Sequence, residues 1–167
     1  SSTNANHRRY FDPNFFDIVL FDQRGCGQSL PNGSTDNNTT SHLVQDVNLI
    51  RANLGITQKA VIFGGSWGSA LALAYAAEHG NSVEALVLRG IFLGSPDEVL
   101  WFTDGLKRFM PEAHQELMWD SSGDLVNHYY DRVNSIDHSV AKEACRRWLD
   151  YEIQSMICLL YTSPSPR

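Results

Sequence analysis

Three short, nearly continuous apolar runs alternate with helical patterns in the first 94 residues. The runs are rich in β-branched and aromatic side chains, which is typical of buried strands, and they cover residues 17–22, 59–63 and 83–91. A helix is expected between the first two, because apolar residues recur there at the spacing of one helical face. These are Leu43, Val47, Ile50 and Leu54. N-cap candidates lie in residues 38–41, and Gly55 supplies the stop.

A second, buried helix is predicted over residues 69–79, which are rich in Ala and Leu and end before Gly80. The resulting order is strand, helix, strand, helix, strand. Right-handed crossovers then give a mostly parallel sheet covered on both faces. We therefore expect an α/β fold class.

From residue 95 onward the pattern is helical only. Ser95-Pro96-Asp97-Glu98 combines a capping box with proline at the first helical position. Helical patterns then continue to Met156, with breaks near Pro111, Gly123 and Asn134. A helical block that follows a strand of an α/β sheet is typical of a cap or lid. We predict an incomplete core over residues 1–94 and part of a helical cap over residues 95–157.

Both ends of the sequence depart from these patterns. Residue 1 is not methionine and no signal-peptide pattern follows it, so we expect the natural N-terminus to lie upstream. Residues 158–167, CLLYTSPSPR, share neither the rhythm nor the composition of the preceding helix, and they resemble a translated sequencing-library adapter. The alternative is a natural tail rich in Ser and Pro. We leave this segment out of the fold prediction.

Composition and charge exclude several classes of protein. With 43% hydrophobic and 19% charged residues, the chain does not fit a disordered, collagen-like or coiled-coil protein. A net charge of −6 argues against a nucleic-acid partner and against a polybasic membrane patch. No apolar run approaches the ~18 residues of a membrane span. The cysteines at 26, 145 and 158 form neither a metal cluster nor a disulfide framework, which favours a cytoplasmic protein.

The strongest chemical motif is Gly64-Gly65-Ser66-Trp67-Gly68, between a predicted strand and a predicted helix. In that context Gly-x-Ser-x-Gly is the pattern of a nucleophile elbow, a strained turn that projects the serine hydroxyl above the sheet. We predict Ser66 as the nucleophile and the Trp67 N–H, at the helix N-terminus, as an oxyanion donor. We also expect a side chain at position 64 or 68 to collide with neighbouring backbone. The alternative is a glycine-rich turn in which Ser66 only caps the helix.

Two nucleotide-binding interpretations of this glycine-rich turn can be excluded. No Gly-x-Gly-x-x-Gly opens a helix here, and no Gly-Lys-Ser/Thr follows the glycines. Neither a Rossmann site nor a P-loop is therefore predicted.

Four motifs, in this order and at this spacing, resemble the proline iminopeptidases, which are prolyl aminopeptidases on the α/β-hydrolase fold. They are FDQRGCGQS at 21–29, NNTT at 37–40, FGGSWGS at 63–69 and LRGIF at 88–92. The resemblance covers about residues 7–157. It implies release of N-terminal proline from peptides through an acyl-enzyme on Ser66, without a metal or cofactor. An esterase or amidase of the same fold, or a non-catalytic binding protein, remains an alternative.

A candidate substrate-binding carboxylate lies in the last helical pattern. Ala141, Cys145, Trp148 and Glu152 fall on one helical face, so a carboxylate lies on an apolar stripe and should have a cationic partner. In the resembling family a Trp-x-x-aromatic-Glu segment supplies the glutamate that binds the substrate's α-amino group. The resemblance assigns this role to Glu152. The alternatives are an exposed glutamate late in a helix, or a glutamate paired with Arg147 or Lys142.

The remaining candidates are weaker. By resemblance, Phe92 would line the slot for the pyrrolidine ring, and a core aromatic is the alternative. For Asp22 and Arg24 we expect a local role, through a loop-bracing ion pair and hydrogen bonds. The family order places the catalytic Asp and His after the cap, and we assign no histidine of the cap pattern to the triad. The family's His-Gly-Gly-Pro-Gly oxyanion loop would end just before residue 1. We therefore expect the chain as written to be inactive. Because its sheet would also lack strands on both sides, we expect it to aggregate or fold poorly.

Overall fold

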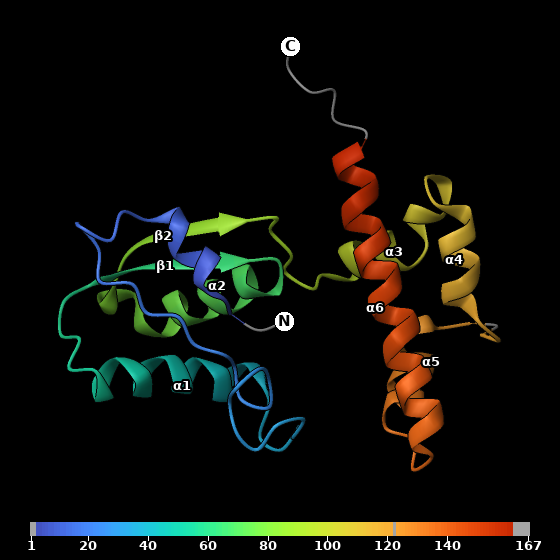
Figure 1. Ribbon diagram of the computed structural model, residues 1–167, viewed down its shortest axis with the longest axis horizontal. Helices are drawn as coiled ribbons and strands as arrows, with labels where there is room; N and C mark the ends of the chain where they lie inside the picture. Colours follow the sequence, from blue (N-terminus) through green and yellow to red (C-terminus); the bar gives the residue numbers. More distant parts are fainter. Residues whose placement is uncertain (1–2, 122, 162–167) are drawn as a thin grey trace. The chain divides into compact units, whose positions relative to one another are not determined.

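The computed structural model describes residues 3–121 and 123–161, with side chains to Met156. The chain divides into two compact units, residues 1–93 and 94–167, which we call the strand unit and the helical unit (Figure 1). Residues 162–167 of the adapter-like segment lie outside the described residues. Helix α6 continues to Tyr161, beyond the expected boundary at residue 157.

The strand unit is built around a parallel pair of strands joined by a helix. Its elements are η1 (Ala5–Tyr10), α1 (Thr40–Asn53), β1 (Ala60–Gly65), α2 (Trp67–His79), η2 (Gly80–Ser82) and β2 (Val83–Arg89). The register runs from Ala60 opposite Val83 to Gly65 opposite Arg89, with one irregularity after Ala60. Parallel strands with a helical crossover confirm the expected α/β class.

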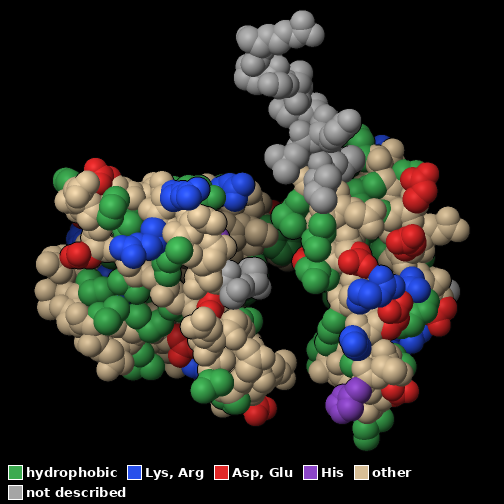
Figure 2. Space-filling view, in the orientation of Figure 1, with side chains coloured by type: hydrophobic (Ala, Val, Ile, Leu, Met, Phe, Trp, Pro, Cys, Tyr) green, Lys and Arg blue, Asp and Glu red, His purple; other side chains and the backbone are tan. Residues whose placement is uncertain are grey.

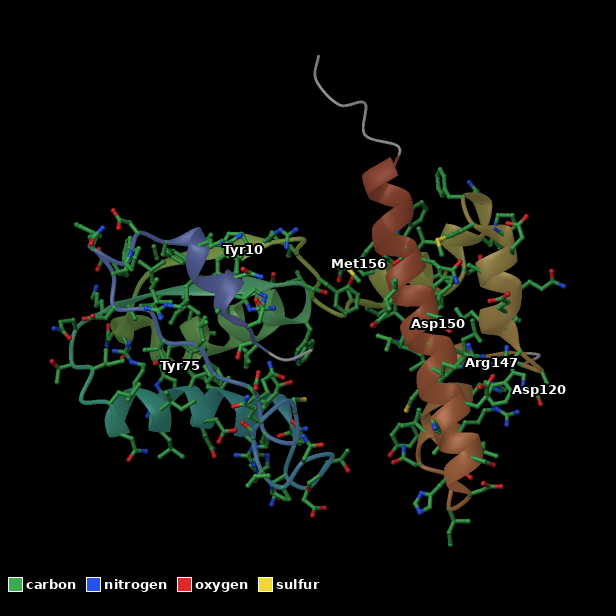
Figure 3. All side chains as sticks on the ribbon, viewed as in Figure 1. Tyr10, Tyr75, Asp120, Arg147, Asp150 and Met156 are labelled. Atoms are coloured by element: carbon green, nitrogen blue, oxygen red, sulfur yellow. The ribbon has the colours of Figure 1, made fainter. Side chains whose placement is uncertain are left out.

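Helices α1 and α2 pack together beside the sheet (Figure 1). Their shared core contains Leu43, Val44, Leu71 and Tyr75, all at most 6% exposed. Tyr75 is labelled in Figure 3, between the two helices. Phe63 of β1 contacts aromatic side chains of the N-terminal segment, and the Tyr10 ring stacks on it at 5.1 Å between centroids. The strands thus pack against α2 and, at Phe63, against aromatic side chains of the N-terminal segment.

The boundaries of α1 follow its capping residues. The Thr39 hydroxyl accepts a hydrogen bond from the backbone N–H of His42, as an N-cap should. Gly55 has a φ of +65°, a conformation that glycine adopts without strain. The predicted start and stop of this helix are therefore confirmed.

The strand predicted over residues 17–22 is wrong. This segment is irregular, and the described sheet contains only β1 and β2. Val19 and Leu20 are 44% and 38% exposed, so the segment is also not buried. A β-strand is stabilised by ladder hydrogen bonds to a neighbour. An apolar run indicates a tendency to be buried but does not show that a pairing strand is present.

The helical unit contains four α-helices and one short 3₁₀ helix among its described residues. These are α3 (Pro96–Thr103), η3 (Gly105–Arg108), α4 (Pro111–Met118), α5 (Leu125–Val133) and α6 (His138–Tyr161). The predicted breaks near Pro111, Gly123 and Asn134 are confirmed. The capping box is also present, because the Glu98 carboxylate accepts from the Ser95 N–H at 3.0 Å and the Ser95 hydroxyl accepts from the Glu98 N–H.

Buried tyrosines tie the helices of this unit together. Tyr151 of α6 is 1% exposed and donates its hydroxyl hydrogen to the Phe102 carbonyl of α3 at 2.8 Å. Tyr129 of α5 is 4% exposed and donates to the Leu117 carbonyl of α4, also at 2.8 Å. Each ring fills the core while its hydroxyl satisfies a carbonyl, so α6 is joined to α3 and α5 is joined to α4.

The surface of the helical unit carries interspersed charges of both signs (Figure 2). Arg146 bridges Glu143 at 2.7 Å and Asp150 at 2.6 Å, and Arg147 also binds Glu143 at 2.7 Å. The hydrogen bond from Arg146, together with that from Arg147, lowers the pKa of Glu143 to about 2. No helix in the described residues combines the length and the apolar character that a membrane span requires.

Candidate active site

Ser66 lies between the last residue of β1 and the first residue of α2, as the motif predicts. Its backbone has φ 54° and ψ −124°, a sparsely populated conformation for a residue with a side chain. The Ser66 N–H donates to the Arg89 carbonyl of β2 at 2.9 Å, and the Ser66 carbonyl accepts from the Ser69 N–H at 2.8 Å. These backbone bonds hold the strained turn against the end of the sheet.

The Ser66 side chain makes no capping hydrogen bond to α2, and the residue is exposed. The side-chain capping bond expected in the alternative interpretation is therefore not found. A serine that is strained, exposed and free of a capping bond leaves its hydroxyl available for chemistry.

Gly64 has a steric reason to be glycine. A Cβ at this position would lie 2.2 Å from the Gly68 carbonyl oxygen. The buried Ser69 hydroxyl donates to the Gly64 carbonyl at 3.1 Å, which fixes the helix start close to the strand end. The same expectation for Gly68 is wrong, because a Cβ added there would meet nothing within 4 Å in the described structure.

Trp67 is the first residue of α2, so its N–H is among those that an α-helix cannot satisfy internally. The helix dipole adds partial positive charge at this end. Trp67 is 40% exposed, which places it at the surface of the strand unit. A backbone donor next to Ser66 is what an oxyanion hole requires.

No histidine in the described part of the strand unit is hydrogen-bonded to the Ser66 hydroxyl. In the strand unit, His42 contacts the Thr39 hydroxyl at 2.7 Å, and His79 stacks against Tyr75. In the helical unit, the Nε2 atom of His114 contacts the Thr103 carbonyl at 2.9 Å. Each of these rings has a local partner.

The glycine-rich loop after residue 21 is braced by two carboxylates. The Asp22 carboxylate accepts from the Thr3 N–H at 2.6 Å and from the Gln28 N–H at 3.0 Å, and these backbone bonds lower the pKa of Asp22. The Arg24 guanidinium binds both carboxylate oxygens of Asp46 in α1, at 2.7 and 2.5 Å. The local role expected for this loop is confirmed, and the ion pair joins Arg24 to Asp46, a partner that the loop motif does not contain.

The buried face of α6 differs by about one residue from the predicted apolar stripe of Ala141, Cys145, Trp148 and Glu152. Ala144 and Tyr151 are 0% and 1% exposed, whereas Cys145 is exposed and carries a free thiol. Trp148 packs against the buried cluster as expected. Glu152 is half-buried at the edge of that face.

Glu152 accepts a hydrogen bond from the Trp148 indole N–H at 3.1 Å. No ion pair joins it to a basic side chain in the described part of the chain, so the expected cationic partner is not found. Arg147, the alternative partner, instead binds Glu143. Exposed apolar side chains flank Glu152 on α6: Leu149, Ile153 and Met156 are 53%, 40% and 59% exposed.

Phe92 follows β2 in the loop that ends the strand unit, and it is half-buried. Its placement fits either the expected slot or a packing role. Among the described residues, no group of three His, Cys, Asp or Glu side chains is arranged to hold a metal ion.

Comparison with known proteins supports the hydrolase interpretation of the motifs. The family model of the alpha/beta hydrolase fold matches residues 7–137. Proline iminopeptidase from Arabidopsis thaliana is 42% identical over 159 residues, which cover 92% of this chain and 42% of that protein. Proline iminopeptidase from Neisseria gonorrhoeae is 42% identical over 151 residues, covering 87% of this chain and 48% of that protein.

A probable proline iminopeptidase from Leptolyngbya boryana is 39% identical over 155 residues, covering 90% of this chain and 48% of that protein. The chain spans about half the length of the curated relatives it matches. The resemblance inferred from the four motifs is confirmed. With the elbow at Ser66 and the match over residues 7–137, the chain belongs to the alpha/beta hydrolase fold family.

Proposed function

We propose that the whole protein is a serine aminopeptidase that releases N-terminal proline from peptides. The observation that carries this proposal is the strained, exposed Ser66 at the junction of β1 and α2. The similarity to proteins named proline iminopeptidase supports the substrate class.

In the proposed reaction, the Ser66 Oγ attacks the carbonyl carbon of the proline residue and loses its proton to a general base. The carbonyl oxygen takes up negative charge next to the Trp67 N–H. The base returns this proton to the peptide nitrogen as the C–N bond breaks, so the shortened peptide leaves as an amine. Water then hydrolyses the ester on Ser66, which releases proline and restores the serine hydroxyl. Phe92 is proposed to contact the pyrrolidine ring.

Glu152 is proposed to bind the free α-amino group of the substrate. Its carboxylate has a neutral hydrogen-bond partner, so its charge is available to an incoming cation. The exposed apolar side chains of Leu149, Ile153 and Met156 beside it suit a ring that carries an amine. Two unit charges ~4 Å apart near a protein surface interact by ~4 kcal/mol, enough to favour a free N-terminus over an acylated one.

We further propose that the 167-residue chain alone has little activity, since no histidine of the described strand unit is hydrogen-bonded to Ser66. Loss of the general base in a serine protease costs ~10⁶ in turnover.

The test compares three substrates in the whole protein: a proline anilide, its N-acetyl derivative and a simple aryl ester. The proposal predicts hydrolysis of the first and little of the second. Glu152→Gln should lower kcat/KM for the proline anilide about 100-fold and leave the ester within about threefold. Equal loss on both substrates, or efficient cleavage of the acetylated anilide, would support a general esterase or amidase instead.

A further inference from the structure

The Trp148 indole is held firmly at the edge of the helical unit's core. Its ring centroid lies 5.2 Å from that of Tyr129 and 5.7 Å from that of Phe102, both in edge or tilted contact. Tyr129 is itself anchored by its bond to the Leu117 carbonyl. Side chains from α3 and α5 therefore fix the direction in which the indole N–H of α6 points. That direction is toward Glu152 Oε1, at 3.1 Å.

An indole N–H differs from the partners of the other acidic side chains on α6. Glu143 and Asp150 are neutralised by the guanidinium of Arg146. An indole only donates a hydrogen bond and carries no net charge. Glu152 is thus held in one orientation while its negative charge remains uncompensated by a cation in the described structure. One carboxylate oxygen accepts from the indole, and the other is not needed for that bond.

We propose that Trp148 is the positioning residue for Glu152 and that it aims the carboxylate at the substrate's ammonium group before substrate arrives. This inference rests on the proposed function of Glu152. A carboxylate that is already oriented loses less side-chain freedom when the amine binds. The gain is made in ground state and transition state alike, so it lowers KM and leaves kcat unchanged.

Replacing Trp148 by phenylalanine in the whole protein tests the inference, because an aromatic ring remains while the N–H is lost. We expect KM for the proline anilide to rise about tenfold, with kcat within about twofold, since a hydrogen bond to a charged group has this order of worth. Turnover of the aryl ester, which has no amine, should not change. In the Glu152→Gln background, Trp148→Phe should add less than about twofold, because the two residues act as one unit.

Trp119→Phe is the matched control in the same unit. The Trp119 ring lies against the guanidinium groups of Arg132 and Arg147, at 4.3 and 4.8 Å, and has no bond to Glu152. Its KM for the proline anilide should stay at the starting value. If Trp148→Phe fails to fold, a benzothienylalanine at position 148 keeps the ring shape and replaces only the N–H by sulfur, and it should give the same rise in KM.

Three results would overturn the inference. If Trp148→Phe leaves the KM for proline anilide unchanged while Glu152→Gln has its selective effect, Trp148 does not position Glu152. The proposed function is then unaffected. An equal loss on anilide and ester shows an ordinary packing role. Absence of any selective effect of Glu152→Gln removes both proposals together.

Discussion

Replacing Gly64 by alanine tests how tightly the turn around Ser66 is built. The added Cβ would lie 2.2 Å from the Gly68 carbonyl oxygen, 2.6 Å from its carbonyl carbon and 3.0 Å from the Ser69 nitrogen. Real Cβ atoms essentially never approach closer than 3.0 Å. The backbone must therefore move by roughly 0.8 Å at the turn that holds the proposed nucleophile.

Overpacking in a folded interior costs ~1–3 kcal/mol. We expect a loss near the upper end, about 3 kcal/mol in the free energy of unfolding, because both clashing groups are backbone. A displacement of ~1 Å at a reacting group also costs ~100-fold in rate. Turnover should therefore fall further than the loss of folded protein explains.

Gly68→Ala is the matched control, two residues beyond Ser66 in the first turn of α2. A Cβ there meets nothing within 4 Å, and alanine is favoured over glycine within a helix by up to ~1 kcal/mol. Urea unfolding and proline-anilide kinetics of both variants of the whole protein give the comparison. A Gly64→Ala variant as stable and active as the starting protein would refute the reasoning, as would equal damage from the two substitutions.

Two further predictions concern the helical unit. Tyr151→Phe should lower the free energy of unfolding in urea by about 1 kcal/mol, because the Phe102 carbonyl loses its hydrogen-bond donor. The control Tyr130→Phe, at a residue that is 68% exposed, should cause no measurable loss. Equal effects of the two substitutions would contradict this prediction. Hydrogen bonds from Arg146 and its neighbour lower the pKa of Glu143 to about 2. Because this carboxyl has its lowered pKa only in the folded state, the stability it contributes is fully present above its ordinary pKa and is lost as the pH falls through about 2. Urea unfolding between about pH 5 and pH 2 should show a decline that Glu143→Gln reduces; an unchanged decline would contradict the assignment.

Local signals predicted the parts of the fold that depend on neighbouring residues. Thr39 and Gly55 mark the ends of α1, the Ser95 capping box begins α3, and the Gly-x-Ser-x-Gly pattern locates the strained Ser66. In each case the hydrogen bond or backbone conformation lies within a few residues of the motif. Such interactions can be deduced from spacing alone.

The errors arise where distant residues decide the outcome. The apolar run at residues 17–22 does not reveal whether a strand pairs with it, and Arg24 binds Asp46, which lies on a different element. On α6, the helical spacing of apolar residues predicted a buried face about one residue away from the observed one. The structure selects Ala144 and Tyr151 because they contact the other helices of the unit. Trp148 and Glu152 are four residues apart on one helix, a spacing from which their hydrogen bond could be predicted.

The central claim is that Ser66 is the nucleophile of a serine hydrolase. Its most direct test is to treat the whole protein with a fluorophosphonate and to map the adduct by mass spectrometry of the digested protein. If Ser66 is the nucleophile, one adduct is expected, on the peptide that contains Ser66. Proline-anilide turnover should fall in proportion to labelling, and Ser66→Ala should carry no adduct. Full turnover by Ser66→Ala, or labelling at another serine that abolishes activity, would contradict it.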